Sequence, residues 1–227
     1  MTASLPEYRL VRSHRRTLAL IVEADGALTV RAPLKLSQAA IHDFLEKKAD
    51  WVRKAQAKLK ARAGQHPRHI FETGDAFPWL GVSFPLQLVA AQRPALQFDG
   101  VRFTLSHKAQ VDAQAYFTAW YREQARLHLQ ARLDHFARLH RFTYRGLRIT
   151  SARTRWGSCN TKNQIAFAWR LVMAPPEVVD YVVVHELAHT VHHNHGLKFW
   201  NLVAEIVPEY KHHIRWLKQH GHTLNLE

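Results

Sequence analysis

The sequence predicts an α+β protein in two parts. A β-rich, mostly antiparallel N-terminal lobe with one helix is expected over residues 1–110, and a largely helical C-terminal unit over residues 111–227. Three observations predict this division. Apolar and polar residues alternate over residues 17–32, the apolar spacing becomes helical after Asp112, and residues 178–191 are apolar on nearly every side of a helix.

The N-terminal lobe begins with a predicted hairpin. Apolar residues alternate over residues 17–22 and again over residues 28–32, and Asp25-Gly26 between them is typical of a tight turn. Ser37 can cap the helix that follows, in which apolar residues recur at helical spacing. We expect Gly64 to end this helix.

A second group of strands is expected before the long helix. A stretch marked by Gly and Pro, residues 73–81, leads to a strand over residues 84–89 and a hairpin over residues 96–103. The helical pattern after Asp112 then continues to about His140.

The C-terminal unit should place one buried helix among shorter elements. We expect strands 147–152 and 165–169, then helices 178–191 and 198–207 and a last helix that ends near His220. Pro176 suits the first turn of the helix over residues 178–191. Because that helix is apolar nearly all round, it should be buried.

The chain is strongly basic, with 32 Lys and Arg against 18 Asp and Glu and a net charge of +14. Residues 122–155 hold nine Arg against Glu123 and Asp134. Such a charge attracts nucleic acid or anionic surfaces. No nucleic-acid-binding motif accompanies it, so we expect a solvated basic face with, at most, a weak nucleic-acid contact.

A reducing compartment is expected from the cysteine content. The single cysteine, Cys159, excludes an internal disulfide framework. The apolar runs are too short to cross a bilayer, and the N-terminal residues do not resemble a signal peptide. We therefore expect a cytoplasmic protein with no membrane contact.

Five histidines lie within residues 182–200, and two of them form an H-E-x-x-H motif. His185 and His189 are four residues apart, so their imidazoles share one face of the predicted helix and can reach one metal ion. Glu186 stands beside the first of them, where it can take a proton from a water on the metal.

A catalytic zinc site needs a third protein ligand and one open position. On a continuous helix His192 would lie about 10 Å from His185, too far to share an ion. His195 can return to the site because Asn194 and Gly196 both tolerate the left-handed backbone that ends a helix. His185, His189 and His195 are therefore the preferred ligands. The alternatives for the third ligand are Glu205 and Glu209.

Other residues near the motif have weaker functional interpretations. Cys159 could be a ligand, as a cysteine is in peptide deformylases, but we expect a structural role. Arg155 and Trp156 could border a cleft, and we favour their packing the strand against the core. Tyr210 and Arg215 could stabilise an oxyanion.

The segment from Arg155 to Trp200 resembles the YgjP-like metallopeptidases, relatives of the SprT-like proteases. It contains Arg-Trp-Gly-Ser-Cys, a Trp-Arg-Leu run, a Pro-Pro pair, the H-E-x-x-H helix, an Asn-His pair and Phe-Trp. The resemblance implies a zincin-like C-terminal unit with His185, His189 and His195 as zinc ligands. It also implies Glu186 as the general base.

Two departures from the family pattern leave the ligands untouched. Phe167-Ala168-Trp169 stands where the family has Leu-Asn-Trp, and Gly196 stands where a Ser is common. With one cysteine the chain lacks the zinc ribbon of SprT itself, so repair of DNA–protein crosslinks is not implied.

We therefore expect a zinc metallopeptidase with Zn²⁺ as cofactor and a protein or peptide as substrate. Its cleft should lie between the histidine helix and the sheet whose last strand carries Ile165, Phe167 and Trp169. An extended peptide could pair with an exposed strand edge there. Two alternatives are a zinc hydrolase for a non-protein or formylated substrate, and a nucleic-acid-associated protein with a structural zinc.

Overall fold

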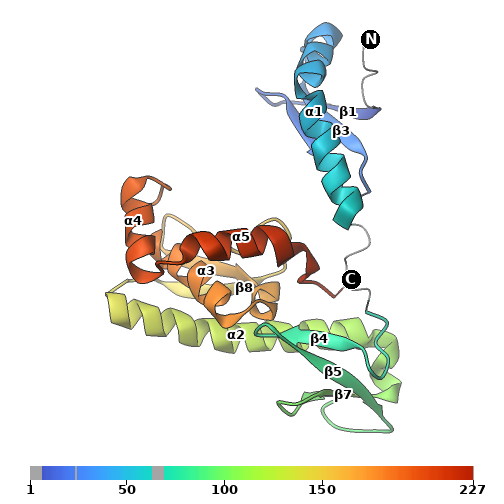
Figure 1. The fold of residues 1–227 in the computed structure, drawn as a ribbon, viewed down its shortest axis with the longest axis vertical. Helices are drawn as coiled ribbons and strands as arrows, with labels where there is room; N and C mark the ends of the chain where they lie inside the picture. Colours follow the sequence, from blue (N-terminus) through green and yellow to red (C-terminus); the bar gives the residue numbers. More distant parts are fainter. Residues whose placement is uncertain (1–6, 24, 63–68, 227) are drawn as a thin grey trace. The chain divides into compact units, whose positions relative to one another are not determined.

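The structure is a computed structural model that describes residues 7–23, 25–62 and 69–226 (Figure 1). The chain divides into two compact units, Met1–His66 and Pro67–Glu227. Residues 110 and 111, where the N-terminal lobe was expected to end, lie in a short 3-10 helix, His107–Asp112. No helix in the described part of the chain has the length and apolarity needed to span a bilayer.

The first unit is a three-stranded sheet with one helix. Its elements are β1 (Tyr8–Ser13), β2 (Ala19–Val22), β3 (Leu28–Pro33) and α1 (Gln38–Arg62). The predicted hairpin is confirmed: β2 and β3 pair antiparallel, and Gly26 between them has a φ of +87°. However, β1 pairs parallel to β3, so this sheet is mixed and not antiparallel throughout.

Helix α1 begins as the sequence predicts. The Ser37 hydroxyl accepts a hydrogen bond from the Ala40 amide at 3.2 Å. Three α1 side chains, those of Ile41, Leu45 and Val52, are fully buried and share a core with the sheet. The predicted stop at Gly64 lies outside the described residues.

The second unit contains a four-stranded sheet near its start. Its strands are β4 (Ala76–Trp79), β5 (Val82–Val89), β6 (Leu96–Phe98) and β7 (Phe103–Ser106), in the order β4-β5-β7-β6. The predicted hairpin of β6 and β7 is confirmed, whereas β5 and β7 are parallel. The expectation of a mostly antiparallel lobe is therefore met only in part.

Helix α2 (Ala113–His140) connects both sheets of the second unit (Figure 1). Phe117 of α2 stacks on Phe77 of β4 with ring centroids 3.9 Å apart, which fixes the first sheet against the helix. Farther along α2, Leu129 and Leu133 are fully buried and belong to the same core as the second sheet.

The second sheet is formed by β8 (Gly146–Thr150), β9 (Gly157–Cys159) and β10 (Gln164–Ala168). The order is β8-β10-β9, with β10 parallel to β8 and antiparallel to β9. The strand carrying Ile165 and Phe167 is therefore central, and β8 and β9 are the edge strands of this sheet in the described part of the chain. Trp169 has left the strand and begins a 3-10 helix, Trp169–Met173.

Three helices complete the second unit: α3 (Pro176–Ala188), α4 (Leu197–Ile206) and α5 (Tyr210–His220), followed by a 3-10 turn, Gly221–Thr223. Arg132 of α2 holds α3 through two hydrogen bonds of 2.6 and 2.8 Å to the Asp180 carboxylate. The expected helix 178–191 is too long by three residues, because α3 ends at Ala188 and His189 is its C-cap.

Candidate metal centre

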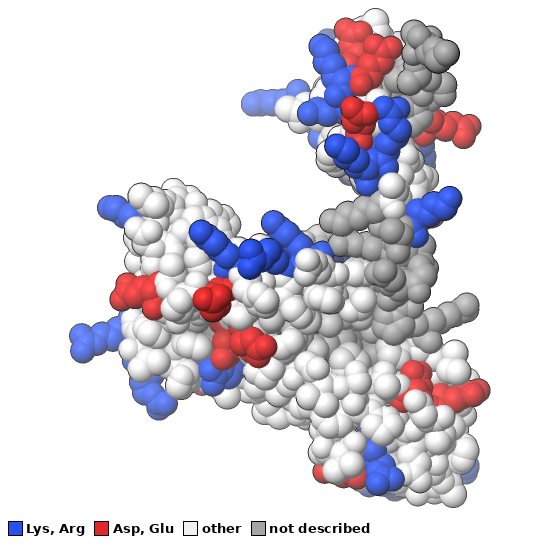
Figure 2. Space-filling view, viewed as in Figure 1, with Lys and Arg blue, Asp and Glu red and all other residues white. Residues whose placement is uncertain are grey.

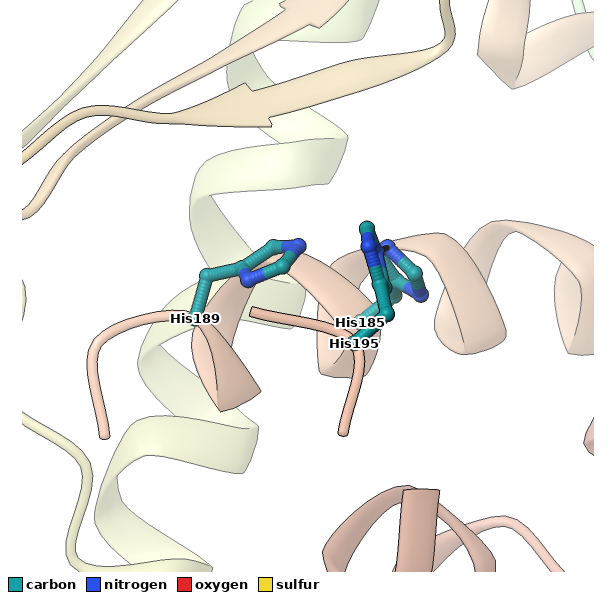
Figure 3. Close-up of side chains that lie close together, drawn as sticks. All are labelled: His185, His189 and His195. Carbon is teal, nitrogen blue, oxygen red and sulfur yellow. Dashed lines mark hydrogen bonds between the residues drawn. The ribbon is translucent and has the colours of Figure 1, made fainter. Parts of the chain in front are cut away.

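Three histidines converge where α3 ends and the chain turns toward α4 (Figure 3). His185 is on the last turn of α3, His189 caps the helix, and His195 lies just before α4. One ring nitrogen of each lies within 4.8 Å of the others, and the Nε2 atoms of His185 and His195 are 3.1 Å apart. Tetrahedral ligands with bonds of about 2.1 Å stand about 3.4 Å apart, so the group fits one shared ion.

The turn after α3 also orients His189. The His192 amide donates to the Ala188 carbonyl at 2.9 Å, which adds one more turn after the end of α3. The His192 carbonyl then lies 3.1 Å from His189 Nδ1. Because a carbonyl only accepts, Nδ1 carries the proton and Nε2 is left with its lone pair. His192 thus contributes its backbone to the site, and the expectation that it continues the helix is wrong.

His185 has a partner one turn earlier on α3. The Tyr181 hydroxyl lies 3.4 Å from His185 Nδ1, on the side of the ring away from His195. Burial, reinforced by the neighbouring His189 and His195, lowers the pKa of His185 to about 3. The imidazole is therefore neutral near pH 7 and can act as a ligand. Sequence reasoning missed Tyr181, although its position four residues before His185 was the available signal.

An aromatic layer from α4 supports all three imidazoles. The ring of Phe199, which is fully buried, has its centroid within 4.9 Å of each of the three histidine rings. Trp200 stacks on His195 with centroids 5.6 Å apart, and Tyr210 stacks on Trp200 at 5.2 Å. Tyr210, a candidate oxyanion donor in the sequence, is thus part of the stack behind His195.

Glu186 lies against the edge strand β9. Its side chain is buried, and a Cβ atom placed on Gly157 would be only 2.5 Å from Glu186 Oε1. Glycine at this position is what allows the carboxylate to approach the strand so closely. Burial raises the pKa of Glu186 to about 8, and the Arg155 charge partly opposes this shift. Gly157 is part of the Arg-Trp-Gly-Ser-Cys motif, but the sequence carries no signal of its contact with Glu186.

The remaining candidate residues of the sequence are not part of the group of three histidines. Cys159 follows on β9, where burial and the Glu186 charge raise its pKa to about 11, so the thiol stays protonated. Glu205 and Glu209, the alternative ligands, are exposed. Within the described residues, the histidine trio is the one group with metal-ligand spacing. Trp156 packs at Gly221, as expected, whereas Arg155 is exposed.

Comparison with known proteins places this geometry in a family. The model of the YgjP-like metallopeptidase domain matches residues 16–220, which is most of the chain. Searches of curated proteins and of solved structures gave no significant match. The matched range includes the three converging histidines, Glu186 and β9. The chain therefore belongs to the YgjP-like family and carries its metallopeptidase domain.

Proposed function

We propose that the protein is a zinc-dependent peptidase whose ion is held by His185, His189 and His195. The observation that carries this proposal is the convergence of three imidazole nitrogens, one of them oriented by a backbone carbonyl. An all-nitrogen set of three ligands suits Zn²⁺ and leaves a coordination position open. When bound, the ion would supply Lewis-acid polarisation of a substrate carbonyl and acidify a water molecule.

Glu186 is the proposed general base. It directly follows His185 in the chain, and its buried carboxylate lies against Gly157 of β9, at the place in the motif from which a base can take a proton from a water on the ion. In this role one carboxylate oxygen accepts a proton from the attacking water and delivers it to the nitrogen of the leaving amine. The close contact with Gly157 holds the carboxylate in place for both transfers.

Strand β9 is the proposed binding edge for the substrate. It is at the end of the order β8-β10-β9, so one of its sides has no neighbouring strand in the described sheet. An extended peptide can add to such an edge through main-chain hydrogen bonds. Because Glu186 lies directly against Gly157 of this strand, a peptide paired there would pass close to the proton acceptor.

The test compares Glu186→Gln with Glu205→Gln, a matched change at an exposed position of α4. We expect both variants to retain one zinc per chain. Glu186→Gln should lower cleavage of an unfolded protein by about 10³-fold, since general acid–base catalysis contributes about 10²–10⁴, and Glu205→Gln should leave it unchanged. Undiminished cleavage by Glu186→Gln would exclude the proposed base, and zinc loss from Glu205→Gln would exclude His195 as the third ligand.

The same proteins separate the alternative functions. Cleavage of formylated or non-protein substrates in preference to peptides, lost in Glu186→Gln, would favour another zinc hydrolase. A structural zinc in a nucleic-acid-binding protein would instead give DNA affinity that falls steeply with salt, and chelation would unfold the second unit.

A further inference from the structure

The face of the second sheet that points away from α3 has an unusual lining. Pairing register places Arg148 of β8, Ala166 of β10 and Ser158 of β9 in one row across the sheet. The preceding row, Leu147 and Ile165, points the other way, into the core. The outer face is therefore a floor of small side chains bordered by an arginine.

A cavity of about 540 Å³ lies over this floor. Arg148 and Arg155, both exposed, line it together with Ser158 and Ala166. A smaller cavity of about 140 Å³ shares these four residues and continues toward the start of β9. The two guanidinium groups thus face one space that borders the proposed binding edge.

The chain segment that lines this cavity carries cations and no carboxylate, and the nearby Glu186 comes from α3. From residue 135 to residue 176 the chain has eight Lys and Arg and no Asp or Glu. In the described part of the chain neither Arg148 nor Arg155 forms an ion pair, whereas Arg126 and Arg132 of α2 each bind a carboxylate. Figure 2 shows Lys and Arg side chains gathered along one edge of the second unit. These arginines are available for an external anion.

We propose that this cavity is a subsite for acidic side chains, so that the enzyme selects polypeptides rich in Asp or Glu beside the cleaved bond. The inference rests on the proposed peptidase function. Arg148 and Arg155 can each bind a carboxylate through charge-assisted hydrogen bonds, and the small floor leaves room for the substrate side chains. Among the described residues that line the larger cavity none is aromatic, and Trp156 lines only the smaller one, so the space lacks the series of aromatic side chains typical of single-stranded nucleic-acid sites.

Binding is tested without turnover, in zinc-loaded Glu186→Gln protein. Fluorescein-labelled peptides of equal length and with the same neutral centre carry Glu-rich, Gln-rich or Lys-rich flanks, and anisotropy gives their affinities. We expect the Glu-rich peptide to bind about tenfold more tightly than the Gln-rich one, a preference that salt reduces. Adding Arg148→Gln and Arg155→Gln should remove most of the preference, and Arg148→Glu should move it toward the Lys-rich peptide.

The matched control is Lys108→Gln, which removes one charge from an exposed position on the 3-10 helix before α2. It should keep the preference. Equal affinity for Glu-rich and Gln-rich peptides, or an equal loss in Lys108→Gln, would overturn the subsite. So would a single-stranded DNA that binds more tightly than the Glu-rich peptide through the same arginines.

A cleavage assay separates this inference from the proposed function. With otherwise wild-type protein, kcat/KM should be higher for the Glu-rich peptide, and Arg148→Gln together with Arg155→Gln should lower that value most of the way to the one for the Gln-rich peptide. Cleavage of both peptides at equal rates would refute the subsite and leave the peptidase standing. Selective binding of the Glu-rich peptide without cleavage of any peptide would refute the peptidase and leave the acidic subsite standing.

Discussion

Helices α1 and α3 bury their side chains in opposite ways. Helix α1 has 25 residues, and among its side chains that the structure describes only Ile41, Leu45 and Val52 are fully buried, along one stripe. Helix α3 has 13 residues, and nine of them are buried, including Glu186. The polar residues of α1 face water at little cost, whereas a carboxylate and an imidazole inside α3 must be compensated by partners.

In a chain with many basic residues and histidines, buried polar side chains indicate a functional site more strongly than exposed ones do. Charges on α1 carry no information about a site, because a one-sided helix tolerates almost any polar residue on its outer face. On α3, by contrast, Glu186 is buried among apolar side chains, and His185 is partly buried beside it. The partners found there, a carbonyl for His189, a hydroxyl for His185 and a glycine for Glu186, are what make the site specific.

The largest expected difference between the two regions is their response to metal removal. Zinc present at about a thousand times its dissociation constant stabilises the folded state by about 4 kcal/mol. Chelation should therefore speed hydrogen exchange of the α3 amides and leave α1, in the other compact unit, unchanged. Equal changes in both helices would show that the two units unfold together and would break the comparison.

Replacing the glycine beside Glu186 should have the next largest effect. In Gly157→Ala the new Cβ would meet the Glu186 carboxylate at 2.5 Å, so either β9 or the side chain must move. A displacement of about 1 Å costs about 100-fold in rate, and overpacking costs about 1–3 kcal/mol of stability. Gly146→Ala on β8, where nothing lies within 4 Å of the new atom, is the control for both measurements. Full activity of Gly157→Ala would contradict the close contact.

Alanine scanning should show the burial patterns directly. Residues 182–184 of α3 are three consecutive buried valines, and each change to alanine should destabilise the second unit by about 2 kcal/mol. Residues 52–54 of α1 contain one buried valine and two exposed cations, so only the first change should exceed about 0.5 kcal/mol. Urea unfolding monitored by hydrogen exchange in each unit measures these differences. If only one of the three changes at residues 182–184 lowered the stability, α3 would have a solvent-exposed face and the comparison would fail.

The smallest effect concerns a buried histidine that packs on α3. His213 of α5 stacks on Tyr181, and its Nδ1 is buried with no hydrogen-bond partner. Burial, and then the neighbouring His212, lowers its pKa below the ordinary 6.5. Below pH 6.5, His213 is therefore protonated to a greater extent in the unfolded chain than in the folded protein. Stability should be full above that pH, should fall as the pH drops from it, and should level off below the folded pKa.

The test measures unfolding free energy against pH in chelated protein. His213→Phe keeps a ring on Tyr181 and should flatten the slope below pH 6.5, whereas His42→Phe, at an exposed position of α1, should not. An unchanged slope in His213→Phe would mean that other groups account for the pH dependence.

The sequence predicted the helices well because their periodicity and end signals are local. Ser37 caps α1, Pro176 begins α3 and Gly221 follows α5, as expected from those residue types. His185, Glu186 and His189 were identifiable from their fixed spacing at the end of an apolar helix, and His195 from the Asn and Gly that flank it after the helix. The three histidines lie close together in the structure. Their role as metal ligands, and that of Glu186 as general base, are proposals.

The missed strands depend on pairing and not on local propensity. β4 contains Pro78, which argues against a strand, but its place at the end of the sheet tolerates a proline. β9 is Gly-Ser-Cys, with little strand preference, and it exists because β10 pairs with it. No Gly or Pro marks the end of α3 at Ala188 in the sequence. The residues that follow form a turn through hydrogen bonds from their amides to the last carbonyls of the helix.

The chain reversal between His189 and His195 gives the bound ion a second role, as a cross-link. An ion held by ligands on both sides of that reversal would close a loop between α3 and α4 much as a disulfide does, and would remove conformational freedom from the unfolded chain. The cost of closing a loop grows only with the logarithm of its length. Extra residues between His192 and His195 should therefore weaken metal affinity gradually, provided that the His192 carbonyl keeps its contact with His189.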